Sequence, residues 1–210
     1  MDNRAYAERT IAAYRVHARK AIRNWARMRV PSRFLREFGR VLPAGARVLD
    51  YGCGIGTELG WLRRRRFDAE GLEGTWEFVQ QARRRCPRAR ILHARFETAH
   101  LPEEGYDGIW CNAALIHLPP AEFRAQLAKL RRALRPGGCL GLTLAWGCRK
   151  GFLQRDWIPG RYFAGHTKGE LLPLLRGWKV RALRVSGKAG RQGRWIQILA
   201  LRPAGRDKIG

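Results

Sequence analysis

The chain has 210 residues, of which 45% are hydrophobic and 28% charged, and this composition is typical of a globular protein. Its length suits one ordinary domain, so we expect residues 1–210 to form a single domain. No stretch reaches the roughly 18 consecutive apolar residues of a membrane helix, and the N-terminal sequence lacks the apolar core of a signal peptide. Composition therefore excludes a largely disordered chain and a membrane-spanning protein.

The chain is strongly basic. Lysine and arginine together number 42 against 17 aspartates and glutamates, so the formal net charge is +25. Such a charge attracts polyanions and favours non-specific, salt-sensitive binding of nucleic acid. An arginine-rich source proteome is the alternative explanation, although it does not account for the shortage of acids. Charge alone thus leaves RNA or another polyanion open as a partner.

The five cysteines are scattered along the chain, odd in number and never spaced as C-x-x-C. They are Cys53, Cys86, Cys111, Cys139 and Cys148. This pattern argues against both a disulfide framework and a zinc site. We therefore expect free thiols, no bound metal and a cytoplasmic location.

Residues 5–29 are predicted to form an amphipathic helix, because apolar and basic side chains each recur every three or four residues. The apolar stripe consists of Tyr14, Ala18, Ile22 and Trp25. The basic stripe consists of Arg15, Arg19, Arg23 and Arg27. The apolar face is expected to pack inward, and the basic face is either solvated or holds the phosphates of a polyanion. Pro31 and Ser32 then begin a second helix that ends near Pro43–Gly45, which completes an N-terminal helical cap over residues 1–43.

From residue 44 to residue 202, short apolar runs alternate with helical stretches, a pattern typical of a parallel sheet with helices on both faces. The predicted strands are Arg47–Tyr51, Asp68–Glu73, Arg90–His93, Asp107–Cys111, Cys139–Ala145, Lys179–Val185 and Trp195–Leu201. The predicted helices between them are Glu58–Arg65, Thr75–Arg85, Ala121–Leu134 and Lys168–Leu175. The turn Ser186–Arg194 has no room for a helix, so the last two strands should form an antiparallel hairpin.

Residues 147–167 show no periodicity and are predicted to form a long loop. Loops of this length in compact domains are usually functional or disordered. This loop and the N-terminal cap are the two segments that the sheet pattern leaves unexplained.

The segment Val48–Gly56, with the sequence VLDYGCGIG, runs from a buried strand directly into three alternating glycines and then a helix. Glycines permit a tight turn and let a ligand approach the backbone, and a helix start presents free N–H groups. The segment therefore predicts a small bound cofactor. It fails as the pyrophosphate motif G-x-G-x-x-G, because Thr57 and Leu59 occupy the positions of the third glycine, so a dinucleotide is disfavoured.

With an acidic residue at the strand end, this segment resembles the first motif of the class I S-adenosylmethionine-dependent methyltransferases. The resemblance implies a Rossmann-like α/β fold and a turn, here Gly52, Cys53 and Gly54, that lies against the methionine part of the cofactor. It also implies that Asp50 orders the turn and contacts that part directly or through water. Glu73, seventeen residues after Gly56, stands where the family has an acid that binds the ribose hydroxyls.

Further motifs extend the resemblance over about residues 44–202, toward small bacterial methyltransferases of the tellurite-resistance and general small-molecule type. These motifs are Tyr106–Asn112, Leu115–Pro119, Leu134–Leu140 and Arg194–Ala200. The resemblance implies that Phe96 or Glu97 lies beside the adenine, although Arg95 departs from the family pattern. It implies that Tyr14 closes over the cofactor.

In that family the end of the fourth strand lies beside the transferred methyl group. The resemblance therefore implies that Cys111 contacts the cofactor, that Trp110 and Asn112 contact the acceptor, and that His117 is the candidate base. The segment Gly160–Phe163, with Arg161 and Tyr162, resembles one that covers the active site and touches the acceptor. Ordinary packing is the alternative for each of these aromatic and histidine side chains.

The leading hypothesis is a methyltransferase that passes a methyl group from S-adenosylmethionine to a small molecule by in-line displacement and releases S-adenosylhomocysteine. Proximity alone can supply roughly 7–11 kcal/mol, so the lack of an obvious catalytic dyad is tolerable. Asn112 is followed by Ala113-Ala114-Leu115 rather than Pro-Pro-aromatic, and there is no Pro-Cys, which disfavours methylation of nucleic-acid base amines and of cytosine carbon. An RNA- or ribosome-directed methyltransferase, a non-catalytic basic binding protein and a dinucleotide oxidoreductase remain alternatives.

Overall fold

The computed structural model describes residues 3–28, 30–187 and 193–204. Its elements are α1 (Asn3–Val16), α2 (Ala18–Ala26), α3 (Arg33–Arg40), β1 (Arg47–Tyr51), α4 (Thr57–Arg64), β2 (Asp68–Glu73), α5 (Trp76–Arg85), β3 (Ile91–His93), β4 (Tyr106–Asn112), α6 (Pro120–Ala133), β5 (Leu134–Trp146), β6 (Lys150–Phe152), β7 (Tyr162–His166), α7 (Lys168–Leu171), β8 (Lys179–Ser186) and β9 (Trp195–Leu201). Single 3-10 turns occupy Leu115–His117 and Leu172–Leu175.

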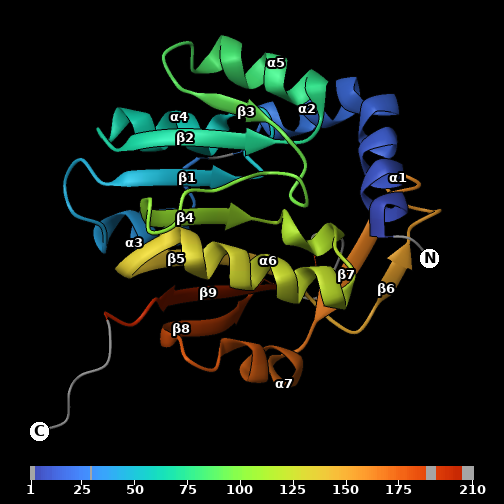
Figure 1. Ribbon diagram of the computed structural model, residues 1–210. Coiled ribbons are helices and arrows are strands. Elements are labelled where there is room, and N and C mark those ends of the chain that lie inside the picture. The colour runs from blue at the N-terminus through green and yellow to red at the C-terminus, as the bar shows by residue number, and fades with distance from the viewer. Residues whose placement is uncertain (1–2, 29, 188–192, 205–210) are drawn as a thin grey trace, which may run out of the picture.

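Within the described residues, the sheet has nine strands, and its main order is β3-β2-β1-β4-β5-β7-β6 (Figure 1). Strands β1 to β5 run parallel, because each connects to the next through a helix or a long crossover. Strand β9 runs antiparallel to β5 and pairs with β8, which confirms the predicted C-terminal hairpin. Part of the predicted turn, residues 188–192, lies outside the described residues.

Two hydrophobic layers cover the sheet, one on each face. On one face α6 packs Phe123, Leu127 and Leu130 against Leu49 and Ile109 of the sheet. On the other face α3, α4 and α5 form a second cluster with the outward side chains of β1, β2 and β4. Figure 1 shows α6 in front of the sheet, with α3 and α4 behind it. The prediction of an α/β fold with helices on both faces is confirmed.

All seven predicted strands are present within a few residues of their predicted ends, but the prediction of seven strands in all was too low. The segment 147–167, predicted as a loop, contributes β6 and β7, which pair antiparallel with each other. Strand β7 also pairs parallel with β5, at Ala145 and Trp146. These residues lie just beyond Thr143, the β5 residue that pairs with Asn112 at the end of β4. The 147–167 segment thereby extends the sheet at the carboxyl end of β5.

The single helix predicted over residues 5–29 is wrong, because the chain bends at His17, whose backbone has φ −104° and ψ 17°. Its apolar stripe still packs: Tyr14 and Ala18 are buried together with Ala21, Ile55 of the glycine loop and Ile158 of the 147–167 segment. The second helix begins at Ser32 as predicted, and the Ser32 hydroxyl caps it by accepting a hydrogen bond from the Leu35 amide at 3.0 Å. The N-terminal helices thus cover the carboxyl ends of the central strands.

The chain order around the sheet positions a site. From β1 the chain moves outward to β2 and β3, then returns to the other side of β1 to form β4 and β5. Loops that leave neighbouring strands in opposite directions open a crevice at the carboxyl ends of these strands, here β1 and β4.

All five cysteines are free thiols. Among the described residues, no helix combines the length and apolar character needed to cross a bilayer.

Candidate active site

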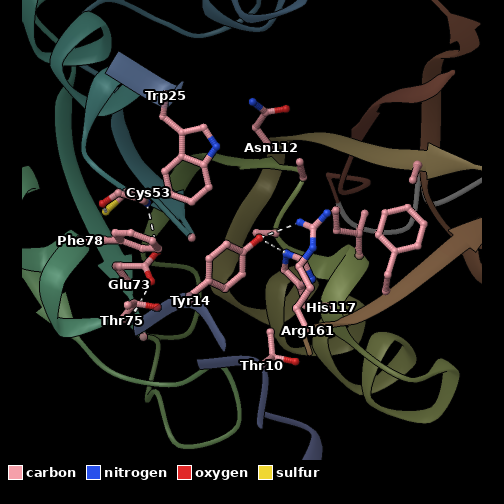
Figure 2. Close-up of a pocket in the computed structure, with 18 of the residues that line it drawn as sticks. Thr10, Tyr14, Trp25, Cys53, Glu73, Thr75, Phe78, Asn112, His117 and Arg161 are labelled. Carbon is pink, nitrogen blue, oxygen red and sulfur yellow. Dashed lines mark hydrogen bonds between the residues drawn. The ribbon is translucent and has the colours of Figure 1, made fainter. Parts of the chain in front are cut away.

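A cavity of about 760 Å³ occupies this crevice. Its floor comes from the loops that follow β1, β2, β3 and β4, and its cover comes from α1, α2 and the segment between β5 and β7. Figure 2 shows Trp25, Phe78 and Glu73 on one side of the cavity and His117 and Arg161 on the other, with the Tyr14 ring between them. Segments far apart in the chain thus enclose one space.

The glycine loop after β1 follows a left-handed path, with φ of +84° at Gly52, +52° at Gly54 and +76° at Gly56. Side chains rarely adopt such backbone angles, which explains the alternating glycines. At Gly52 a side chain would also collide with the β4 loop, because an added Cβ would lie 2.5 Å from the Ala114 Cβ. The loop is therefore fitted closely against the end of β4.

Glu73, at the end of β2, ties this loop to the start of α5. Its Oε2 accepts a hydrogen bond from the Gly54 amide at 3.0 Å, and its Oε1 accepts one from the Thr75 amide at 2.7 Å. Burial raises the pKa of the Glu73 carboxyl, while these backbone amides act in the opposite direction. Glu73 also lines the cavity.

Glu58, in the first turn of α4, is a second cavity carboxylate that the sequence reasoning missed. Its Oε2 accepts from the Trp110 indole at 2.7 Å, and its Oε1 accepts from the Asn112 amide at 3.1 Å. Burial raises its pKa, and these two hydrogen bonds lower it. The only signal in the sequence was its place two residues after the last glycine, at the start of a helix.

A chain of hydrogen bonds joins three segments on the other side of the cavity. The Tyr14 hydroxyl lies 2.9 Å from Nε2 of His117 and accepts a hydrogen bond from Nη1 of Arg161, also at 2.9 Å. Arg161 in turn donates to Oδ2 of Asp156, from Nε at 2.9 Å and from Nη2 at 2.5 Å. Figure 2 shows the Tyr14 hydroxyl pointing to His117 and Arg161 and away from Glu73.

The protonation of His117 follows from its partners. Nδ1 lies 2.7 Å from the Tyr162 carbonyl, which can only accept, so Nδ1 carries the proton. Burial lowers the pKa of His117 to about 3, and the nearby Arg161 charge adds to this effect. The ring is therefore neutral at physiological pH, and Nε2 accepts the Tyr14 proton. Both ring nitrogens are engaged within the protein.

Comparison with known proteins identifies the fold that carries this site. Residues 48–138 match the family model described as a methyltransferase domain. The crystal structure of Burkholderia thailandensis 1,6-didemethyltoxoflavin-N1-methyltransferase, with bound 1,6-didemethyltoxoflavin and S-adenosylhomocysteine, superimposes with a TM-score of 0.76 at 18% identity. The match covers 97% of this chain and 91% of that one. The chain therefore has a methyltransferase fold, and residues 48–138 resemble a methyltransferase domain.

Curated methyltransferases are similar to this chain over part of their length. Methyltransferase GfsG of Streptomyces halstedii is 35% identical over 108 residues, which are 48% of this chain and 38% of that protein. The malonyl-[acyl-carrier protein] O-methyltransferase of Salmonella typhimurium is 30% identical over 138 residues, 64% of this chain and 54% of that protein. The matched regions thus span about half or less of these relatives.

Most residues predicted for the site line the cavity. They are Tyr14, Gly52, Cys53, Gly54, Glu73, Phe96, Glu97, Asn112, His117 and Arg161. Cys53 contributes backbone, since its sulfur is directed at Gly71, where an added Cβ would approach within 2.7 Å. Phe96 stacks on Tyr51 with ring centroids 4.5 Å apart, so its ring forms a fixed wall.

Four predicted site residues lie outside the cavity lining. Trp110 is fully buried between Phe34 and Phe38 and reaches the cavity only through Glu58. Cys111 is fully buried on the opposite face of β4, in the cluster under α6. Successive side chains of a strand point to opposite faces of the sheet. Trp110 and Cys111 therefore enter the two opposite hydrophobic layers, and neither side chain lines the cavity.

Tyr162 contributes its carbonyl to His117, but its ring packs against Tyr6 and Phe152 outside the cavity. Asp50 is buried beneath the glycine loop and does not line the cavity. Burial raises its pKa well above the usual range, and the charges of Glu58 and Glu73 raise it further. Its position fits the predicted ordering of the loop and not a direct contact with a ligand.

Other cavity residues escaped the sequence reasoning because they belong to segments without a recognised motif. These residues are Thr10, Trp25, Phe78, Asp156 and Trp157. Trp25 packs edge-on against Phe78 with ring centroids 4.8 Å apart and lies near Trp157 at 6.1 Å. An aromatic residue on the apolar stripe of the N-terminal helices was the available signal.

Proposed function

We propose that this chain is an S-adenosylmethionine-dependent methyltransferase that acts on a small-molecule acceptor. The observation that carries the proposal is the single cavity, which joins the glycine loop and Glu73 to a compartment covered by α1 and the 147–167 segment. Its volume of about 760 Å³ lies within the range of about 300–1,000 Å³ for small-ligand sites. Donor and acceptor therefore have room to meet in one cavity.

The residues around the glycine loop fit S-adenosylmethionine, which carries an ammonium group, a sulfonium and a ribose diol. Glu73 and Glu58 supply carboxylates for cations and hydroxyl donors, and no lysine or arginine lines the cavity at this loop within the described residues. The same acids would repel the pyrophosphate of a dinucleotide. This donor set supports the methyl donor over a nicotinamide nucleotide.

Bound S-adenosylmethionine supplies a methyl group made electrophilic by a positively charged sulfur. The residues of this chain would bind and orient it: Glu73 would accept from the ribose hydroxyls, and the Gly52–Gly54 turn would let the ligand approach the backbone. Trp25 and Phe78, with Tyr14, exclude water from the space between the loop and Arg161. Proximity and desolvation of this kind account for much of a methyl transfer barrier.

We assign His117 a positioning role and not that of a general base. Its low pKa makes it a weak proton acceptor, and its Nε2 already accepts from Tyr14. Its function in this account is to hold the Tyr14 hydroxyl, and with it Arg161, at the cavity wall. Asn112 and Arg161 line the space expected for the acceptor.

A labelling experiment tests the substrate class. The protein is incubated with S-adenosylmethionine carrying a labelled methyl group, together with either a low-molecular-mass metabolite fraction or total RNA. The proposal predicts protein-dependent label in the small-molecule fraction and background label in RNA. Label that enters RNA alone would replace the small acceptor with an RNA substrate.

An RNA-directed methyltransferase is the second candidate, because Arg19, Arg23 and Arg27 of the N-terminal cap are exposed and have no acidic partner within the described residues. Arg15 differs, since it pairs with Glu77 at 3.5 Å and lies before the bend at His17. A functional phosphate contact would give RNA affinity that falls steeply with salt and less steeply in an Arg19→Gln, Arg23→Gln, Arg27→Gln variant. RNA affinity that is absent, or unchanged by salt, removes this candidate.

A further inference from the structure

The two ends of the cavity carry opposite charge. Around the loops after β1, β2 and β3, the charged lining residues are Glu58, Glu73, Glu97 and Arg95, and Arg95 is paired with Glu8 at 3.0 Å. Beside β5, β7 and β9 they are Arg149, Arg161, Arg194 and Asp156. Carboxylates thus dominate the end assigned to the methyl donor, and guanidinium groups dominate the other end.

Asp156 does not neutralise the basic end beyond one arginine. Its Oδ2 accepts from both Nε and Nη2 of Arg161, whose side chain is only 8% exposed. A guanidinium has five N–H donors, and the bonds to Asp156 and Tyr14 use one on each nitrogen. One N–H on Nη1 and one on Nη2 have no partner within the part of the chain that the structure describes.

Arg149 and Arg194 are exposed at the cavity lining and have no carboxylate partner among the described residues. The Arg194 guanidinium lies 5.3 Å from the Trp146 ring centroid, and the Trp146 amide donates to the Arg194 carbonyl at 2.9 Å. The sequence of the neighbouring turn, Ser186–Arg194, contains no acid. The positive charge at this end is therefore not compensated locally.

The surfaces beside these arginines are aromatic. Trp146, Trp157, Phe163 and Trp195 all line this end of the cavity. The Arg161 guanidinium lies 5.4 Å from the Trp157 ring centroid and 5.9 Å from that of Phe163, so cation and ring faces are interleaved. Flat apolar walls with guanidinium groups at their edge suit a flat ligand with an anionic substituent.

We propose that the methyl acceptor is a planar aromatic or conjugated organic anion, whose ring lies among these tryptophans and whose charged group faces Arg149 and Arg194. The inference rests on the proposed methyltransferase function and specifies its acceptor. Guanidinium groups match the two oxygens of a carboxylate in geometry as well as charge. A cationic or neutral acceptor would leave the basic end without its counter-charge.

Calorimetry on the full chain saturated with S-adenosylhomocysteine tests the inference with matched probes. These are indole-3-acetate against indole-3-acetamide, 4-hydroxybenzoate against 4-hydroxybenzamide, and 2-naphthoate against 2-naphthamide. We expect at least one acid to bind about tenfold or more tightly than its amide, as a charge-assisted hydrogen bond contributes. The Arg149→Gln and Arg194→Gln variants should lose most of that advantage while their affinity for S-adenosylhomocysteine stays unchanged.

Arg155→Gln is the matched control, because Arg155 is exposed in the same segment but does not line the cavity. This variant should keep the preference for acids. The inference is overturned if amides bind as tightly as acids, if the preference survives both cavity variants, or if no acid binds. A protein that binds no S-adenosylhomocysteine contradicts the proposed function itself, whereas binding of S-adenosylhomocysteine without any acid contradicts only the acceptor class.

Discussion

The Tyr14 hydroxyl lies 2.9 Å from Nε2 of His117, although 103 residues separate the two in the chain. With Arg161 as a third partner, this contact fastens the N-terminal cap and the 147–167 segment to the end of β4. The hydrogen bonds run in one direction: Arg161 donates to Tyr14, Tyr14 to His117, and His117 to the Tyr162 carbonyl. The Tyr14 hydroxyl therefore links three segments that line the cavity.

Replacing that hydroxyl should destabilise the protein. Tyr14→Phe leaves Nε2 of His117 without a donor and one Nη1 proton of Arg161 without an acceptor, which should cost about 1–3 kcal/mol of unfolding free energy. Denaturation by urea measures the change. Tyr6→Phe is the control, because the Tyr6 ring stacks on Phe152 while its hydroxyl has no hydrogen bond within the described residues. Equal stability of the two variants would contradict the role assigned to Tyr14.

Stability should fall in acid because of His117. The folded pKa of about 3 lies below the ordinary value of 6.5, so between these values the unfolded chain binds a proton that the folded protein does not. The free energy of unfolding therefore rises with pH in this window, by up to about 1.4 kcal/mol per pH unit for one group. Stability from this group is complete above the window and is lost as pH falls through it.

His117→Gln keeps an acceptor for Tyr14 and removes the titrating ring, so its unfolding free energy should depend less on pH between about pH 4 and 6. His166, whose pKa burial lowers to about 4, contributes with the same sign. His166→Gln should therefore remove a separate share and leave that of His117. If the unfolding free energy changes equally with pH in the wild type and in His117→Gln, His117 is not buried in its neutral form.

The glycine loop can be tested by a pair of substitutions at left-handed positions. Gly45 has φ +71° with open space around it, and Gly52 has φ +84° with the Ala114 Cβ only 2.5 Å from an added Cβ. Both alanine variants incur left-handed strain of about 1–2 kcal/mol, and Gly52→Ala should lose about 1–3 kcal/mol more through the collision. Equal losses in urea denaturation would mean that the loop does not press against β4 as described.

The sheet was predictable because the buried parallel strands are short apolar runs separated by helical patterns. Strands β6 and β7 were not, since they have three and five residues and form through pairing with each other and with the end of β5. The bend at His17 was equally hidden, because no glycine or proline marks it and the apolar stripe continues on both sides. Tertiary contacts decide both features.

For the site, glycine geometry and acid spacing predicted Gly52, Gly54 and Glu73 as cofactor-binding residues, and these residues line the cavity. The motif at the end of β4 did not reveal which side chain reaches the cavity. Trp110 packs under α3 and Cys111 under α6. Both faces of the parallel sheet are covered by helices, so the strand is apolar on both faces and its sequence does not show which face each residue occupies. Glu58 was missed because a single acid in a first helical turn ordinarily complements the helix dipole.

The central claim is that Glu73 and the glycine loop hold S-adenosylmethionine, and titration calorimetry with S-adenosylhomocysteine tests it most directly. We expect one binding site in the wild type and an affinity at least about tenfold weaker in Glu73→Ala, through loss of a charge-assisted bond. The affinity should be unchanged in Glu103→Ala, because Glu103 is an exposed acid that does not line the cavity. Absent binding in the wild type, or equal affinity in Glu73→Ala, would contradict it.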